Sequence, residues 1–209
     1  MKTVLTMILG ALFLVSQAGM AGAVQFDVAA SIPLAAGVKM TLNSVDSVTN
    51  EFTKQIGASS TALTFNPMIF VPGEHNDINI WLPNHYFALD IAPDGAGTPD
   101  VTLKYTEGVN PNLADGKHGL GWKTVATFKR MTFQLPKNKE DDLSKKLLKD
   151  INNEHILASD IGTGSWLRVY FGIVTGDPTA NEPAGSEVFS NGDRPGAYDG
   201  ALVITASVV

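Results

Sequence analysis

The stretch VQFDVAASIP at residues 24–33 decides the fold of this chain. Its apolar side chains fall on every second residue, and the residues between them are mostly small or polar. This period of two is typical of a β-strand with one buried face. The pattern ends at Pro33, which lacks the backbone N–H that a strand ladder needs. We therefore expect the first strand to end just before this proline.

The segment before this strand has the layout of a secretory signal peptide. Lys2 precedes an apolar run at residues 4–15, and the small triplet Ala21-Gly22-Ala23 follows. This order predicts cleavage after Ala23 and a mature chain that starts at Val24. A membrane anchor is the alternative, but a spanning helix needs roughly 20 apolar residues. We therefore expect residues 1–23 to be a signal peptide and the mature protein to be secreted.

Composition limits what the mature chain can be. The 209 residues less the 23 of the signal leave 186, enough for one domain with a sizeable core. The formal net charge is −6 and no basic cluster occurs, so nucleic acid is not an expected partner. The chain has no cysteine, so stability must come from core burial and assembly rather than from disulfides.

The rest of the chain predicts an all-β antiparallel sandwich. Short β-rich segments alternate with turns such as Pro93-Asp94-Gly95 and Gly176-Asp177-Pro178, which favours a sandwich over a βαβ array. Besides the first strand, the predicted strands are Val38 to Val45, Ala62 to Phe70, Asn79 to Leu82, Tyr86 to Ile91, Val101 to Thr106, Thr124 to Leu135, Trp166 to Val174 and Ala197 to Val209.

One charged stretch, Lys137 to Ser159, interrupts this β pattern. Leu143, Leu147, Leu148 and Ile151 recur there at helical spacing, which predicts one short inserted amphipathic α-helix within Asp141 to Leu157. We expect this helix to cover an end or edge of the sandwich, and a partner-binding helix is the alternative. The Gly- and Pro-rich stretch at residues 176–196 is typical of a surface connection.

Motifs of enzymes are absent from the sequence. The four histidines occur singly, and no nucleophile elbow, Walker or dinucleotide glycine motif is present. His75, Asp77 and His85 could converge on a metal, although single histidines in loops are more often plain surface residues. We therefore expect neither an enzyme nor a cofactor nor a metal site.

Two tryptophans are candidates for glycan contact. Trp81 and Trp122 could offer a ring for sugar stacking on the surface of the sandwich, and core packing is the alternative for each. Trp122 follows Gly119-Leu120-Gly121, a loop-like context that favours partial exposure. A monomeric secreted binding module, holding a glycan or a surface protein, is therefore the second functional hypothesis.

The two ends of the mature chain give the most specific indication of function. An alternating strand directly follows the signal, with Val24, Phe26, Val28, Ala30 and Ile32 on one face. A long alternating strand ends the chain, with Tyr198, Gly200, Leu202, Ile204, Ala206 and Val208 on one face. A sandwich that lacks one strand exposes a hydrophobic groove between two unpaired edges. If the N-terminal strand of another molecule fills that groove, the contact is head-to-tail and propagates into a fibre.

The same two ends resemble a known family. The segment FDVAASIP at residues 26–33, followed by VKMTL at residues 38–42, is similar to the mature N-terminus of major subunits of alternate chaperone-usher fimbriae, the class 5 or colonization-factor type. The segment PGAYDGALVI at residues 195–204 resembles the closing Gly-x-Tyr-x-Gly strand of those pilins and of the related common-pilus subunits. The lack of cysteine also fits that group.

This resemblance implies an immunoglobulin-like sandwich that is incomplete and is completed by a donor strand. It divides the chain into a signal peptide at 1–23, a donor-strand extension at 24–36 and a pilin-like domain at 37–209. It also implies a structural subunit that is held by a periplasmic chaperone, passed to an outer-membrane usher and built into a homopolymer on the cell surface for adhesion. No cofactor is implied. The alternative for the first strand is ordinary pairing within its own sandwich.

Overall fold

The computed structural model describes residues 25–31, 37–56, 60–73, 79–111 and 113–209. Strands dominate this part of the chain and most of them pair antiparallel, so the predicted all-β sandwich is confirmed. The expected signal peptide at residues 1–23 lies outside the described residues.

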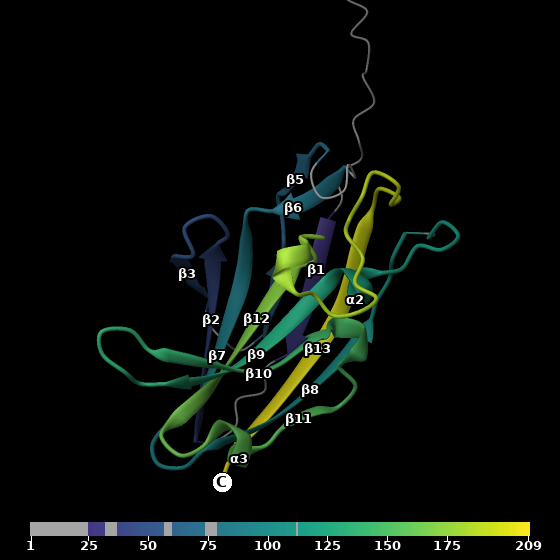
Figure 1. The fold of residues 1–209 in the computed structure, drawn as a ribbon. Coiled ribbons are helices and arrows are strands. Elements are labelled where there is room, and N and C mark those ends of the chain that lie inside the picture. The colour runs from purple at the N-terminus through teal and green to yellow at the C-terminus, as the bar shows by residue number, and fades with distance from the viewer. Residues whose placement is uncertain (1–24, 32–36, 57–59, 74–78, 112) are drawn as a thin grey trace, which may run out of the picture.

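A five-stranded sheet contains both ends of the described chain (Figure 1). Its strand order is β11-β8-β13-β1-β4, and its members are β11 (Glu154–Ile156), β8 (Pro99–Glu107), β13 (Ala197–Val208), β1 (Gln25–Ser31) and β4 (Ser60–Thr64). The first strand therefore lies beside the last one. This neighbourhood is the feature on which the functional argument depends.

A six-stranded sheet forms the other layer. Its strand order is β10-β9-β12-β7-β2-β3, and its members are β10 (Lys139–Leu147), β9 (Thr124–Thr132), β12 (Ser165–Ile173), β7 (His85–Pro93), β2 (Val38–Asp46) and β3 (Phe52–Ile56). A separate two-stranded ribbon joins β5 (Met68–Val71) to β6 (Ile80–Pro83).

The hydrophobic core lies between the two larger sheets. Alternate residues of each strand face it, as the period of two predicts. Strand β12 shows the pattern most clearly, because every second residue from Ser165 to Ile173 is buried. The inward faces of β7, β8 and β13 contribute Leu89, Leu103 and Ile204, each at most 1% exposed.

Most predicted strands occur near their predicted bounds. The stretch Ala62 to Phe70 is the exception, because it divides into β4 and β5, which belong to different sheets. Strands β3, β10 and β11 were not predicted from the sequence. The described helices are short: α2 (Leu120–Lys123), α3 (Ala158–Ile161), and the 3-10 turns η1 (Leu148–Asp150) and η2 (Pro178–Ala180).

The prediction of an inserted helix within Asp141 to Leu157 is wrong in position, although the described chain does have short helices, α2 and α3. The stretch Lys137 to Ser159 holds the edge strand β10, then η1, then β11. Strand β10 pairs antiparallel with β9 and has a register shift between Asp142 and Ser144. Such a bulge breaks the period of two, so the leucines after it fall at spacings that resemble a helix.

The connection from β12 to β13 is more buried than predicted for a surface loop. Phe189 is 1% exposed and its ring packs edge-on against Tyr198, with 5.1 Å between ring centroids. The backbone N–H of Trp81 donates a hydrogen bond to the carbonyl of Phe189. Phe189 therefore ties this connection to the core.

Candidate functional site

Strand β1 lies between β13 and β4 and joins these two strands into one sheet. Its residues 25–31 pair in parallel with residues 197–203 of β13. On the other side, residues 27–31 pair antiparallel with residues 60–64 of β4. Within the five-stranded sheet β4 pairs with β1 alone, so removal of β1 would leave β4 without a partner there and β13 with a free edge. This position is the candidate functional site.

Val28 anchors β1 in the core. Its side chain is fully buried and belongs to the main hydrophobic cluster. In register it stands opposite Gly200 of β13 and Leu63 of β4, and Leu63 is only 1% exposed. Full burial of a valine contributes about 1.5 to 3 kcal/mol. Val28 therefore supplies a substantial part of what keeps β1 in its sheet.

The inward face of β13 is the one predicted from its alternation. Tyr198, Gly200, Leu202, Ile204 and Ala206 are buried, Val208 is partly buried, and the residues between them face outward. The last strand thus presents its apolar face to the core along nearly its whole length. Any strand that occupies the place of β1 lies against this strand.

The Gly-x-Tyr-x-Gly pattern has a local packing reason. A Cβ at Gly200 would stand 2.3 to 2.7 Å from atoms of the Tyr105 ring, so only glycine leaves room for that ring. Tyr198 is fully buried, and its hydroxyl donates a 2.9 Å hydrogen bond to the carbonyl of Arg194. Burial raises the pKa of Tyr198 to about 12, with the nearby Asp193 carboxylate acting in the same direction.

The predicted donor-strand residues are covered only in part. Val28 is described in full, and the backbones of Phe26 and Ala30 are in register with Tyr198 and Leu202. Val24 and Ile32 lie outside the described residues. In the single chain β1 completes its own sheet, as the alternative of an ordinary first strand predicted. Arrival of the strand from another molecule stays a prediction.

The two tryptophans proposed for glycan contact lie in different surroundings. The Trp122 ring stacks on His118 with 4.6 Å between centroids, and Lys149 Nζ lies 5.4 Å above it. Trp81 is partly buried against the core, with its ring 5.1 Å from that of Phe70. Each ring therefore has a packing role, and neither lines the large cleft described next.

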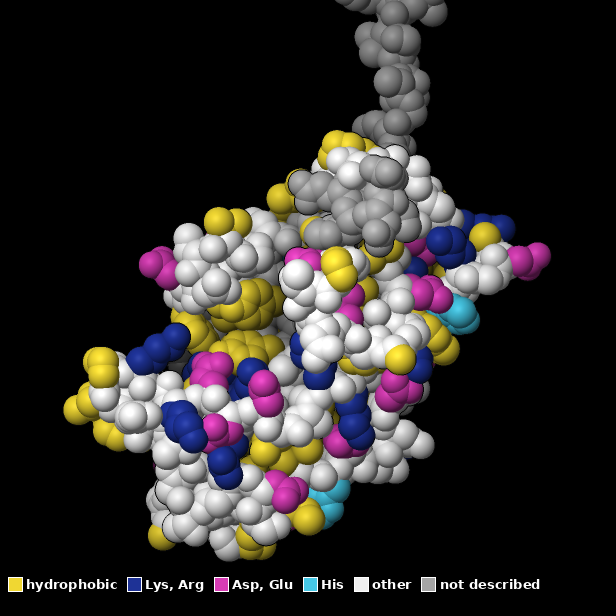
Figure 2. Space-filling model, viewed as in Figure 1, with side chains coloured by type: hydrophobic (Ala, Val, Ile, Leu, Met, Phe, Trp, Pro, Cys, Tyr) yellow, Lys and Arg dark blue, Asp and Glu magenta, His cyan; other side chains and the backbone are white. Residues whose placement is uncertain are grey.

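A cleft of about 600 Å³ lies on the outer face of the six-stranded sheet. In Figure 2 hydrophobic side chains lie in a hollow on this face, with charged side chains around it. The cleft is lined by residues from β3, β7, β9, β10, β12 and the β2–β3 and β9–β10 connections: Asn50, Phe52, Tyr86, Lys129, Met131, Lys137, Asn138, Glu140, Arg168 and Tyr170. Aromatic rings beside polar groups are the composition of many ligand sites.

Arg168 is the fixed centre of this cleft. Its Nε and Nη2 donate hydrogen bonds of 2.7 and 2.8 Å to the two oxygens of Asp90, and its guanidinium lies 4.9 Å from the Phe52 ring. Burial alone would lower the pKa of Arg168, but the hydrogen bonds to Asp90 outweigh it and raise that pKa. The Tyr170 hydroxyl donates a 2.9 Å hydrogen bond to Glu140, and burial raises the pKa of Tyr170 to about 12.

The histidines make separate contacts. His85 Nε2 lies 3.0 Å from the carbonyl oxygen of Thr64, His118 contacts Glu187, and His155 contacts Asp100. Of the three residues considered as metal ligands, His75 and Asp77 lie outside the described residues. Among the residues that the structure describes, no three acidic or histidine side chains are grouped to hold a metal ion.

Comparison with known proteins adds no identity. No family model matches this chain, and no curated protein matches it. In the described ranges of the chain, no helix is both long and apolar enough to span a membrane.

Proposed function

We propose that this chain is a structural subunit of an extracellular fimbria that polymerises by donor-strand exchange. The observation that carries the proposal is the place of β1, between β13 and β4 of one sheet. The resemblance of both chain ends to class 5 pilins supports the same reading. The unit is exported, kept folded by a chaperone strand, and joined to its neighbour at an usher.

The pairing direction of β1 favours exchange. β1 runs parallel to β13, whereas every other strand pair among the described residues is antiparallel. Parallel pairing is slightly less stable per residue than antiparallel pairing. A strand from another molecule can enter the same place in the opposite direction. The exchanged arrangement keeps the apolar contacts and makes the longer ladder, with β13, antiparallel, while the shorter ladder, with β4, becomes parallel.

Head-to-tail exchange at this place produces a fibre, whereas reciprocal exchange between two subunits would give a closed dimer. The donor surface is the N-terminal segment, while the acceptor surface is the edge formed by β13 and β4. These surfaces are different, so each subunit that donates a strand still has its own acceptor to fill. Growth then continues until a partner without a donor segment ends it.

Deletion of residues 24–32 tests the proposal. The shortened chain should form no polymer with itself, because it has no strand to donate. A synthetic peptide of residues 24–32, added during refolding, should restore a folded monomer with a higher thermal midpoint. Filaments formed normally by the shortened chain, seen by electron microscopy, would refute the proposal. So would a shortened chain that is fully stable and unaffected by the peptide.

The cleft around Arg168 favours a second candidate function, a binding module for a glycan. Its rings, from Phe52, Tyr86 and Tyr170, lie beside carboxylate and amide groups. A glycan array probed with monomeric protein tests this candidate. Replacement of Tyr170 by alanine should weaken any binding about tenfold. Binding that is lost instead in a Trp122→Ala variant would place the site at the tryptophan and not in the cleft.

A further inference from the structure

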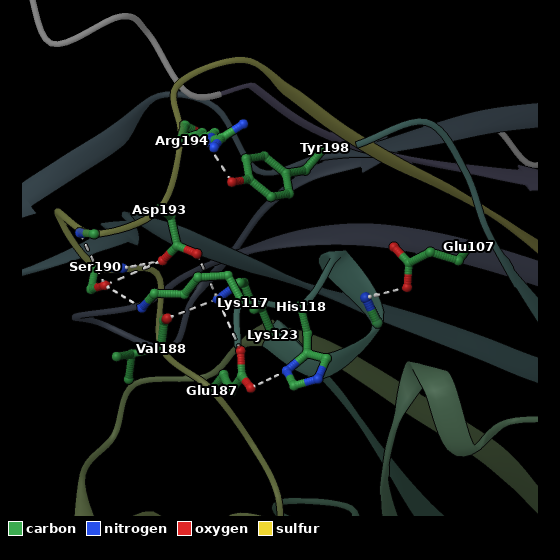
Figure 3. Close-up of polar contacts among 12 residues, drawn as sticks. Glu107, Lys117, His118, Lys123, Glu187, Val188, Ser190, Asp193, Arg194 and Tyr198 are labelled. Atoms are coloured by element: carbon green, nitrogen blue, oxygen red, sulfur yellow. Dashed lines mark hydrogen bonds and ion pairs between the residues drawn. The ribbon is translucent and has the colours of Figure 1, made fainter. Parts of the chain in front are cut away.

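A buried group of charged side chains lies where α2 meets β9. Lys123 is the last residue of α2, and its side chain is fully buried. Glu187, Ser190 and Asp193 lie in the connection between β12 and β13, and the Asp193 side chain is 2% exposed. Figure 3 shows Lys123 between the carboxylates of Asp193 and Glu187. An amine and a carboxyl group are thus enclosed together away from water.

The two oxygens of Asp193 have different surroundings. Oδ1 lies 3.0 Å from Lys123 Nζ in an ion pair but accepts no hydrogen bond from the residues that the structure describes. Oδ2 accepts hydrogen bonds from the backbone N–H of Ser190, at 2.8 Å, and from its hydroxyl, at 3.3 Å. Donors fixed on one oxygen stabilise negative charge that develops there during attack on the carboxyl carbon. The other oxygen is left free to depart.

Glu187 is placed to move a proton. Its Oε2 accepts a 3.4 Å hydrogen bond from Lys123 Nζ, and its Oε1 contacts His118. Lys123 Nζ also donates to the carbonyl of Val188 and lies 4.9 Å from the centroid of the Phe189 ring. A carboxylate within hydrogen-bond reach of an amine can take its proton and pass it on.

We propose that Lys123 and Asp193 become joined by an isopeptide bond, formed by the chain itself. Glu187 takes a proton from the Lys123 ammonium and passes a proton to Asp193 Oδ1. The neutral amine then attacks the carbon of the neutral carboxyl group, placing negative charge on Oδ2 beside Ser190. Glu187 carries the second proton from the nitrogen to the Oδ1 hydroxyl, which leaves as water while the amide forms. An ammonium and a carboxylate thereby become one neutral amide and one water molecule, with no oxidant, reductant or cofactor.

The surroundings favour this reaction over a lasting ion pair. Two charges held away from water carry a large desolvation penalty, which their mutual attraction only partly offsets. The amide is neutral and releases that penalty. Because the reacting groups are already held in contact, little further ordering is needed.

The bond would link the two layers of the sandwich covalently. Lys123 precedes β9 of the six-stranded sheet, and Asp193 precedes β13, the strand beside β1. Tension transmitted along β13 would then reach the other sheet through a covalent link. This inference does not depend on the proposed function, because the reaction needs one chain alone.

Intact mass spectrometry of the purified full chain tests the inference. The mass should be lower by one water molecule than the mass calculated for the processed sequence. Proteolysis should release a branched peptide that joins the segment around Lys123 to the segment around Asp193. The Glu187→Gln variant keeps both reacting groups and removes the proton carrier, so it should show the full mass and no branched peptide.

Two controls sharpen the test. Lys139 contacts Asp141 at 2.9 Å, but its side chain is 56% exposed, so a Lys139→Met variant should keep the mass deficit. A deficit of one water without a branched peptide would indicate cyclisation at an Asp-Gly pair, such as Asp94-Gly95, and would overturn the inference. A wild-type chain with the full calculated mass would overturn it as well.

Discussion

The two large sheets of this sandwich are completed in different ways. In the six-stranded sheet every neighbouring pair is antiparallel, and both edge strands, β3 and β10, pair with the strand that precedes them in the chain. In the five-stranded sheet, continuity depends on β1, which carries the parallel pair with β13 and is the only strand that joins β4 to the rest. One layer is thus antiparallel throughout with a hairpin at each edge, and the other depends on the start of the chain.

This difference indicates which strands must come from the same chain and which strand another molecule could supply. A strand in the middle of the six-stranded sheet is tied to the chain on both sides, so no other molecule can supply it easily. A terminal strand can leave its place while the rest of the chain stays connected. The sheet that holds β1 is therefore the layer through which subunits can be joined.

The sharpest test of this contrast compares two buried valines. Val28 lies in β1 and Val169 in the central strand β12, and both are fully buried. An aspartate at either place puts an unpaired charge in an apolar core, which costs several kcal/mol. We expect Val169→Asp to abolish the native state. We expect Val28→Asp to release β1 and block polymerisation, while the free peptide of residues 24–32 restores thermal stability.

The outcome is read from circular dichroism melts with and without the peptide. Val203 stands beside Ser31 in the β13–β1 register but is 44% exposed, so Val203→Asp is the matched control and should change little. If the peptide fails to stabilise Val28→Asp, β1 is an internal strand that cannot be exchanged, and the contrast between the sheets disappears.

A smaller effect is expected on the outer face of the six-stranded sheet. Asp90 of β7 accepts hydrogen bonds from Arg168 and Trp166 of the neighbouring strand β12, and so links these two strands through side chains. Asp90→Ala would leave the Arg168 cation, whose side chain is only 12% exposed, without its main partner. We expect a loss of about 2 to 3 kcal/mol in the free energy of unfolding by urea.

Asp142 supplies the control for this prediction. It contacts Lys129, but its side chain is 79% exposed. Exposed ion pairs contribute little, so Asp142→Ala should change the unfolding free energy by less than about 1 kcal/mol. Equal losses in the two variants would mean that the Arg168–Asp90 pair has no special role in this sheet.

Two glycines, one in each large sheet, allow side-chain packing in the two sheets to be compared. A Cβ at Gly200 of β13 would collide with the Tyr105 ring, whereas a Cβ at Gly172 of β12 would meet only the Tyr86 Cβ, at 3.8 Å. Overpacking of this kind costs about 1 to 3 kcal/mol. Gly200→Ala should therefore lower the urea midpoint clearly, and Gly172→Ala should leave it nearly unchanged. Similar midpoints would show that Tyr105 can move aside and that the glycine is not required there.

The sequence predicted the buried strands well because their pattern is local. In β12 and β13 the alternation of apolar and polar residues follows directly from facing one core, and the structure shows the predicted inward faces. The pattern failed in β10, where the bulge between Asp142 and Ser144 shifts the phase and charged residues mark an edge strand. Pairing with β9 overrides the local helix preference of that lysine- and leucine-rich stretch.

Sites built from distant segments left little local signal. Lys123 and Asp193 come together only because the β12–β13 connection folds back over α2. Their contact therefore cannot be predicted from the spacing of residues in the sequence. The cleft had a partial signal in the sequence, since two of its lining residues, Arg168 and Tyr170, are bulky side chains at outward positions of β12. Bulky side chains at outward positions of a strand can therefore indicate a binding site on the surface of a sheet.

The smallest expected effect is on the free energy of unfolding at acid pH. It tests how the edge strand β10 is held in its sheet. The pKa of Asp141 lies below its ordinary value of 3.8, because Lys139 first and then Arg130 donate hydrogen bonds to its carboxylate. A pKa lowered in the folded state gives stability that is present above pH 3.8 and is lost as the pH falls through the folded pKa.

Asp141→Asn should therefore flatten the acid end of the curve of unfolding free energy measured between about pH 2 and pH 5. The effect should be small because the Asp141 side chain is only partly buried, and Asp142→Asn should leave the curve unchanged. If both variants match the wild-type curve, the ion pairs along β10 do not hold this edge, and the β9–β10 hairpin is stabilised by its ladder and by Leu147 alone.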